Sequence, residues 1–187
     1  MAELNTKVVT GKIRFSYLHV FKPKLNDDGT PGKYGACLLI PKRDTVTVDK
    51  INKAIEAARL GSAELFKGKV PARLRSPMHD GDKEKPNGGE WGEECKGCWV
   101  INAGSNNKPG IVDRQMNEIV DPGEFVSGDY GRASLNFFAY NSSGNTGVGC
   151  GLNNIQFLSK GVPLAGNSRP EDDFKDAYED DEDDLGI

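Results

Sequence analysis

The stretch that decides the fold is residues 131–158, which read GRASLNFFAYNSSGNTGVGCGLNNIQFL. Two runs of alternating residues flank a turn signal, SSGN, at residues 142–145. Alternation of apolar and polar residues is typical of a strand with one buried face, and a glycine-containing turn between two such runs predicts a β-hairpin. The face of the first strand that we expect in the core carries Ala133, Leu135, Phe137 and Ala139.

A second hairpin is predicted upstream of this one. Residues 6–21 alternate over their whole length and predict one long, half-buried strand. An extended basic loop with an NDDG turn signal separates it from residues 34–40, where the period of two resumes before Pro41. One side of the first strand is expected to carry Val9, Gly11, Ile13, Phe15 and Tyr17.

One helix is predicted after Pro41. Thr47 is expected to cap it, apolar residues recur at intervals of three and four, and the helix should end near Gly61. Residues 68–94 are polar and rich in glycine and proline, which predicts a long central loop with short pieces of structure. Residues 98–103 predict a further strand.

These elements predict a mainly β protein. We expect an OB-fold, a five-stranded barrel with one main helix and a long central loop, although a β-sandwich shares the same pattern. The barrel domain should span residues 1–160, and a flexible acidic tail should follow over residues 161–187. Four cysteines without an export signal favour reduced thiols and a cytosolic protein.

The charge of the chain is divided unequally along its length. The last seventeen residues hold ten carboxylates and one lysine, so their net charge is −9, although the net charge of the whole chain is only −4. The preceding residues hold 23 basic and 18 acidic side chains and carry +5. Such an acidic run cannot bury enough apolar surface to become ordered, so it should be free to bind partners or the basic body itself. A simple solubility tail is the alternative.

The tail combines acids with apolar residues at its end, a pattern suited to a hydrophobic pocket with a basic rim. We expect it to bind replication proteins such as a polymerase or a helicase. The residues expected to make this contact are Asp180, Asp181, Glu182, Asp183, Asp184, Leu185 and Ile187.

The sequence offers little for catalysis or metal binding. The two histidines, His19 and His79, lie near no recognisable nucleophile motif, and no phosphate-binding loop is present. Cys95 and Cys98 form a CxxC that could supply two ligands to zinc, with His79 as a third, but a second pair is missing. We therefore expect no enzyme activity, no cofactor and no metal, and reduced thiols in a turn.

Single-stranded nucleic acid is bound by cations that follow the phosphates and by exposed rings that stack on bases. Both kinds of residue are interleaved in this chain. Core packing is the alternative for each ring, and it is preferred for Phe137. Trp91 is expected to be exposed, because its neighbours GGEWGEE offer no apolar partner. The expected DNA-binding residues are Lys12, Arg14, Tyr17, Lys22, Lys24, Tyr34, Arg73, Arg75, Trp91, Arg132, Phe138 and Tyr140.

Three stretches resemble a group of bacteriophage single-stranded DNA-binding proteins: YLHVFKP at residues 17–23, KYGACLLIPKRD at residues 33–44, and residues 131–156. The acidic tail is a further match. The resemblance implies an OB-fold, sequence-independent binding of single-stranded DNA, and a role in phage replication, recombination and repair in the cytoplasm of an infected bacterial host. It does not imply which residues contact DNA.

Two other functions stay open. The first is a protein–protein interaction module whose acidic tail binds a basic partner, without nucleic-acid binding, and deletion of the tail separates it from the DNA-binding function. A magnesium-dependent nuclease is disfavoured because the acids of the body show no clustered spacing. No membrane partner is expected, and a homo-oligomer is left open.

Overall fold

Strands dominate the computed structural model, which describes residues 5–164 and residue 174. The described chain forms eight strands, one α-helix and three short 3₁₀ helices. In chain order these are β1 (Lys7–Val9), β2 (Ile13–His19), β3 (Tyr34–Pro41), α1 (Thr45–Leu60), η1 (Ala63–Phe66), β4 (Met78–Asp80), η2 (Glu93–Cys95), β5 (Cys98–Ser105), β6 (Gly110–Val112), η3 (Pro122–Glu124), β7 (Tyr130–Ser142) and β8 (Asn145–Ser159).

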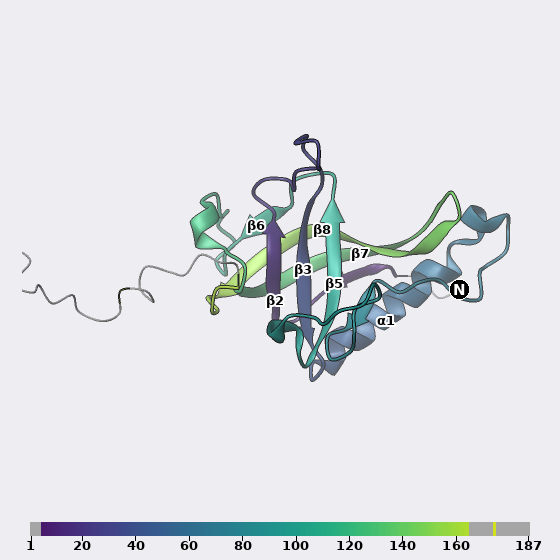
Figure 1. The fold of residues 1–187 in the computed structure, drawn as a ribbon, viewed down its shortest axis with the longest axis horizontal. Coiled ribbons are helices and arrows are strands. Elements are labelled where there is room, and N and C mark those ends of the chain that lie inside the picture. Colours follow the sequence, from purple (N-terminus) through teal and green to yellow (C-terminus); the bar gives the residue numbers. More distant parts are fainter. Residues whose placement is uncertain (1–4, 165–173, 175–187) are drawn as a thin grey trace, which may run out of the picture.

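Five of the strands close into a ring. β7 pairs with β2, β2 with β3, β3 with β5, and β8 with β7, all antiparallel, while β5 and β8 meet in parallel at Gly104 and Gly151. The predicted five-stranded barrel of an OB-fold is therefore confirmed. β1, β4 and β6 are short additions that pair with β7, β5 and β8. In Figure 1, β2, β3 and β5 form the front of the molecule.

The hairpin predicted over residues 131–158 is the longest pairing in the structure. β7 and β8 pair from Tyr130 with Ser159 to Ser142 with Asn145. Ser143 and Gly144 have φ of 51° and 86°, the two left-handed positions that a tight hairpin turn needs. The end of this hairpin, residues 138–149, projects beyond the barrel to the right in Figure 1, and we call it the hairpin arm.

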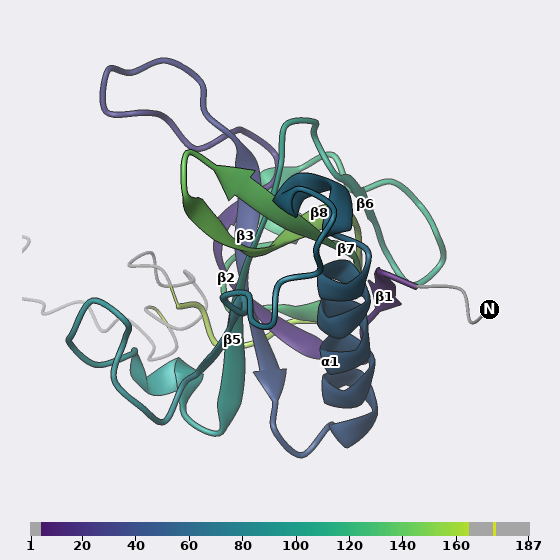
Figure 2. The same ribbon diagram turned by 90° about the vertical axis from the view of Figure 1, so that its right-hand side faces the viewer.

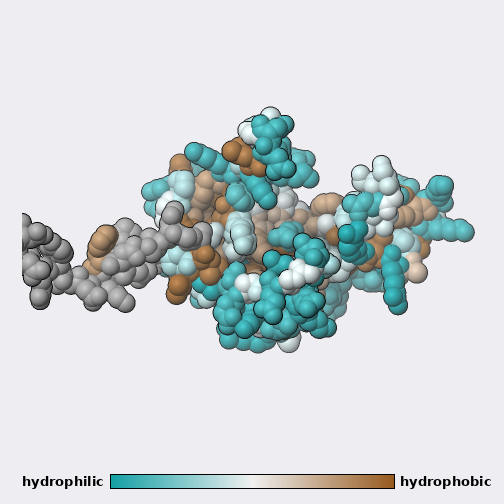
Figure 3. All heavy atoms as spheres, viewed as in Figure 1, coloured by the Kyte–Doolittle hydropathy of each residue, from teal (hydrophilic) through white to brown (hydrophobic). Residues whose placement is uncertain are grey.

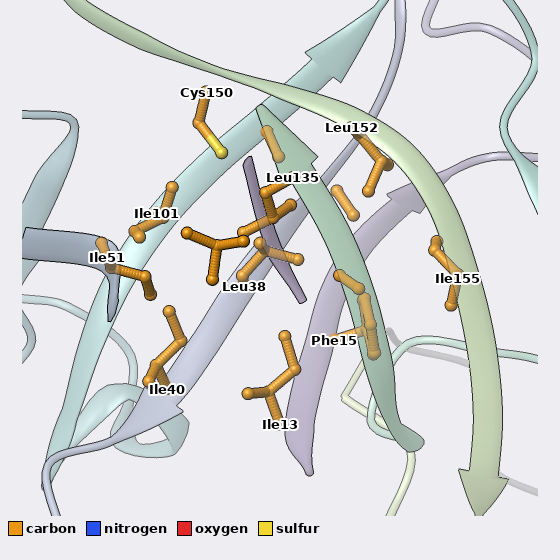
Figure 4. Packing of buried hydrophobic residues seen from close by; sticks show 14 of the residues in the cluster. Ile13, Phe15, Leu38, Ile40, Ile51, Ile101, Leu135, Cys150, Leu152 and Ile155 are labelled. Carbon is orange, nitrogen blue, oxygen red and sulfur yellow. The ribbon is translucent and has the colours of Figure 1, made fainter. Parts of the chain in front are cut away.

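The barrel interior is filled by the alternate residues that face inward from each strand. Leu135 and Phe137 are buried there as predicted, together with Phe15 and Ile101. The helix α1 contributes Ile51 to the same core. Figure 4 shows part of this core, including Phe15, Ile101 and Leu135, where apolar side chains meet between the front strands and the β7–β8 pair. Burial of these apolar side chains is the main stabilising contribution to the fold.

The prediction of one strand over residues 6–21 is wrong. The chain pairs with β7 as β1, turns at residues 10–12, and continues as β2 between β3 and β7. Thr10 marks the change of partner, because its backbone and hydroxyl both bond to Ala133. Val8, and not Val9, is buried, and Tyr17 stands exposed in a bulge with φ of 47°.

Asp44, and not Thr47, caps α1. The Asp44 carboxylate accepts hydrogen bonds from the Thr47 amide at 3.2 Å and from the Thr47 hydroxyl at 2.6 Å. The Thr47 hydroxyl in turn accepts a bond from the Gly11 amide, which joins the helix to the turn before β2. The helix ends before Gly61 as predicted. Within residues 5–164 no helix is long and apolar enough to span a bilayer.

Residues 68–97 form the predicted long loop, which we call the excursion. It contains β4 and η2, so the prediction of short pieces of structure is confirmed. Lys42, just after β3, binds Asp80 at 2.6 Å and Asp82 at 2.7 Å, and Asp82 also accepts from the Gly97 amide. These contacts hold the excursion against the lower front of the barrel in Figure 1.

Candidate nucleic-acid interface

The outer face of β3 and β5 is divided into a covered half and an open half. Alternation along the strands points Cys37 and Leu39 outward on β3, and Val100 outward on the neighbouring β5. These side chains are nevertheless buried, because Cys95 of the excursion joins them in a second hydrophobic cluster. The excursion therefore closes this half of the face.

Trp91 belongs to this covered half. Its ring packs against the second cluster, lies 5.9 Å from the His79 ring and has the Lys85 ammonium 5.3 Å from its centroid. The expectation that Trp91 has no apolar partner is wrong, because β3 and β5 supply one from a distant part of the sequence. In this arrangement the half-buried ring is not free to stack on a base.

The CxxC joins the end of the excursion to β5. Burial raises the pKa of Cys95 to about 11 and that of Cys37 to about 12, so both are protonated thiols at neutral pH. All four cysteines are free, as predicted. Cys95, Cys98 and His79 are not gathered into a metal-binding set, and none of three or more such residues occurs within residues 5–164.

The open half has a floor of glycines. Gly35 on β3 lies opposite Gly104 on β5, and Gly104 lies beside Gly151 on β8. Their chain neighbours Ala36, Ala103 and Leu152 are buried in the core, so the three glycines face outward. We call this row of Gly35, Gly104 and Gly151 the glycine floor.

Two of these glycines have no explanation in the packing of the protein. A Cβ added to Gly35 would lie 2.7 Å from the Ala103 carbonyl oxygen, so the fold itself requires glycine there. A Cβ on Gly104 or Gly151 would approach no atom closer than 3.5 or 3.4 Å, an ordinary contact. Glycine in a strand costs about 0.5–1 kcal/mol of stability relative to alanine, and it often marks close approach by a ligand.

The hairpin arm borders the floor on one side with aromatic rings. Phe138 lies over Gly149, where an added Cβ would be 2.7 Å from the ring, and Tyr140 lies over Gly147 in the same way at 2.6 Å. The Arg75 guanidinium binds Asn145 at 2.6 Å, and its carbonyl accepts from Val148. The structure thus brings the predicted residue Arg75, from the excursion, against the arm that carries Phe138 and Tyr140. Arg73 is exposed two residues before Arg75.

A basic loop stands at the same end of β3 and β5 as the floor. The β2–β3 loop, residues 20–33, carries the exposed Lys22 and Lys24 and leads directly into Tyr34, which pairs with Ser105. Lys108, in the loop after β5, lies 5.9 Å from the ring of Phe21. Figure 3 shows the β2–β3 loop as a mostly hydrophilic projection at the top of the view.

The remaining predicted residues lie elsewhere. Lys12 and Arg14 both pack on the Tyr130 ring, at 5.0 and 5.5 Å, and Arg14 also donates to the carbonyls of Gly128 and Val162. Arg132 lies near β1, where its Nε donates to the Thr10 carbonyl. These cations are not brought to the glycine floor, since Arg14 lies opposite Leu39 of the covered half and Arg132 lies on the side of β7 next to β1. The predicted tail residues lie outside the described residues.

Sequence reasoning missed the glycine floor and Lys108. Gly35, Gly104 and Gly151 lie in three separate parts of the sequence, so no local pattern joins them. Only the barrel closure at Gly104 and Gly151 places them in one row. Lys108 carries no signal of its own, since its importance comes from its position beside Phe21.

The fold has counterparts among solved phage proteins. The chain is similar to the single-stranded DNA-binding protein from bacteriophage Enc34 in complex with ssDNA, at 23% identity, with a TM-score of 0.69 over 86% of this chain and 90% of that one. It is also similar to gp2.5, a single-stranded DNA binding protein encoded by bacteriophage T7, at 18% identity and a TM-score of 0.57, over 92% and 94% of the two chains.

Two sequence comparisons extend over most of the chain. A putative protein, p50, from Acyrthosiphon pisum secondary endosymbiont phage 1 is 24% identical over 167 residues, which covers 86% of this chain and 87% of that protein. The model of the family described as Enterobacter phage Enc34, ssDNA-binding protein matches residues 6–185. The chain therefore belongs to the family of the Enterobacter phage Enc34 ssDNA-binding protein.

Proposed function

We propose that this protein binds single-stranded DNA without sequence preference, on the glycine floor between the hairpin arm and the β2–β3 loop. The observation that carries the proposal is the pair Gly104 and Gly151, which leaves backbone exposed where the packing would accept a side chain. Membership of a family described by ssDNA binding, and the likeness to a solved complex with ssDNA, support the same function.

The geometry suits a strand whose bases face the protein. Bases can lie flat on exposed backbone at the floor and stack on Phe138, which is 45% exposed, or on Tyr34. Each base–ring stack contributes about 1–3 kcal/mol and reads no sequence, because every base has a π-face. Lys22, Lys24 and Lys108 at one end, with Arg73 and Arg75 at the other, would contact phosphates.

The start of the acidic tail lies close to this surface. Lys160 and the Gly161 amide bind the buried carboxylate of Asp129, at 3.1 and 3.0 Å. Further along, the Val162 carbonyl accepts from Arg14, and Leu164 packs on the covered half of the face. These contacts support a role in which residues 165–187 compete with DNA for the cations and are displaced when a strand binds.

We infer that the protein acts in phage DNA replication, recombination and repair, in the cytoplasm of an infected bacterial host, as a binding protein without catalysis. A displaced tail would present its acids, from Asp180 to Asp184, together with Leu185 and Ile187, to replication proteins such as a polymerase or a helicase. The acid–apolar pattern of these residues is the support for this role. The interaction module without DNA binding is the second candidate.

Fluorescence anisotropy of a labelled oligothymidine tests the proposal. Full-length protein should bind it more tightly than a duplex of equal length, with a log–log salt slope of about −0.7 per phosphate neutralised. A version ending at Pro170 should bind more tightly than the full chain, because it lacks the acidic competitor. No binding by either form at low salt would contradict the proposal and favour the interaction module. The oligonucleotide should stay intact with magnesium.

A further inference from the structure

An apolar hollow of about 330 Å³ lies on the outer side of β1, β7, β8 and β6. Two of its lining residues, Val9 and Met116, are 43% and 69% exposed. Figure 2 shows β1 and β6 on the side of the barrel away from the excursion and the β2–β3 loop. The lining of this apolar hollow includes Val9, Val112, Met116, Arg132 and Ser134.

Lysines line a neighbouring hollow that shares Val9 with the apolar hollow. Val9 also lines a second hollow of about 400 Å³, whose wall includes Lys7, Lys50 and Lys53. Lys53 forms an exposed pair with Asp49 at 3.0 Å, while Lys7 and Lys50 have no acidic partner within the described residues. The surface therefore combines an aliphatic depression with three lysines on one side and Arg132 within it.

This combination fits an acidic peptide that also carries aliphatic side chains. A volume near 300 Å³ is at the lower end for ligand pockets and suits a short apolar segment. Single-stranded DNA is a poorer match, because the exposed large apolar residues that line the hollow, Val9 and Met116, include no ring for stacking. The carboxylates of the peptide would meet the lysines, and its aliphatic residues would enter the apolar hollow.

We propose that the apolar hollow binds residues 180–187 of a second copy of this chain. That segment reads DDEDDLGI, five acids followed by Leu185 and Ile187, so its charge and its apolar residues complement the surface just described. The contact places one copy after another in a head-to-tail series. This contact would link copies that are bound side by side on one DNA strand, a role that rests on the proposed function.

The path of the chain favours a neighbouring copy over the same copy. Leu164 packs on the covered half of the front face, whereas the apolar hollow lies on the opposite side of the barrel. The 23 residues that follow Leu164 have a root-mean-square span of roughly 26 Å as a coil. A 160-residue domain has a radius of gyration of about 15 Å, so reaching its own hollow would require the segment to pass around the barrel. A neighbour on the same strand can present its hollow directly.

Sedimentation of full-length variants without DNA tests the contact. Met116→Glu places a carboxylate in the apolar hollow, and L185D combined with I187D removes the aliphatic residues from the segment. Wild type should self-associate reversibly as its concentration rises. The self-association constant of each variant alone should be lower than that of wild type by roughly tenfold or more. A mixture of the two variants should form one-to-one pairs, since each retains the surface that the other has lost.

Val120→Glu is the matched control, because Val120 is as exposed as Met116 but does not line the apolar hollow. It should associate as wild type does. A monomeric wild type at tens of micromolar would overturn the proposal, as would wild-type association of either variant, or failure of the mixture to pair. Short oligothymidine affinity of Met116→Glu should equal that of wild type, and a loss would overturn the proposal by assigning the hollow to DNA. If wild type self-associates but does not bind the oligonucleotide, only the proposed function is contradicted.

Discussion

Phe137 and Phe138 are adjacent in the sequence but face opposite sides of β7. Phe137 is buried in the barrel core, and Phe138 is exposed over Gly149. Phe138→Ala should lower oligothymidine affinity by about 1–3 kcal/mol with little change in stability, because it removes a stacking surface. Phe137→Ala should instead lower the free energy of unfolding by about 3–5 kcal/mol. Anisotropy and urea unfolding measure the two effects, and equal behaviour of both variants would contradict the assignment.

Gly104 provides a test of the floor itself. Gly104→Val should fold normally, because an added Cβ meets nothing closer than 3.5 Å and valine favours strands. It should weaken single-strand binding by tenfold or more, since a branched side chain would occupy the place of a base. Ser134→Val, which lies in the apolar hollow and not on the glycine floor, is the control and should bind the oligonucleotide as wild type does. An affinity of Gly104→Val for single-stranded DNA equal to that of wild type would mean that the DNA binds elsewhere on the protein.

For single residues, the sequence could predict which side of its own strand a side chain faces better than which distant residues it contacts. Alternation placed Leu135 and Phe137 inside and Phe138 outside correctly, because the period of a strand is fixed. It could not place Trp91, whose apolar partners Leu39 and Val100 come from β3 and β5. Nor could it show that Arg14 is bound by the Val162 carbonyl, a contact between distant parts of the chain.

Among the elements, the excursion depends on a few polar contacts. Lys42 holds it by binding Asp80 and Asp82, and these contacts lower the pKa of both carboxyl groups. Lys42→Ala should increase hydrogen exchange and proteolysis within residues 81–97, while the exchange of β7 and β8 stays unchanged. Lys53→Ala, which breaks an exposed pair on α1, is the control. Protection of residues 81–97 equal to wild type would show that the apolar cluster alone holds the excursion.

His79 makes the stability of the excursion sensitive to pH. Burial lowers the pKa of His79 below its usual value of 6.5, so the unfolded chain takes up this proton at a higher pH than the folded chain. The stability contributed by the neutral ring is complete above pH 6.5 and is lost as the pH falls towards the lower folded pKa. Urea midpoints at pH 7.5 and 5.5 should therefore differ less for His79→Gln than for wild type. Equal differences would contradict this assignment.

The elements were predictable where local signals and tertiary structure agree. The SSGN turn and the alternation around it defined β7 and β8, and Pro41 and Gly61 marked the ends of β3 and α1. The break between β1 and β2 was not predictable, because the alternation continues through residues 10–12. It arises from a change of pairing partner that only the closed barrel imposes.

For the whole molecule, charge is divided between a basic body and an acidic tail. The structure shows where the chain leaves the barrel towards the tail, because the contacts of Val162 and Leu164 hold this segment on the front of the barrel. The same front carries the glycine floor, whereas the apolar hollow lies behind. The proposed DNA and protein contacts therefore use different faces and can be altered separately.

Photocrosslinking of full-length protein to iodouracil-substituted oligothymidine, followed by peptide mapping, tests the central claim most directly. The account predicts crosslinks to the aromatic residues around the glycine floor, Tyr34, Phe138 and Tyr140, and their loss in Gly104→Val. Crosslinks confined to Tyr130, or to residues 112–116 beside the apolar hollow, would contradict it.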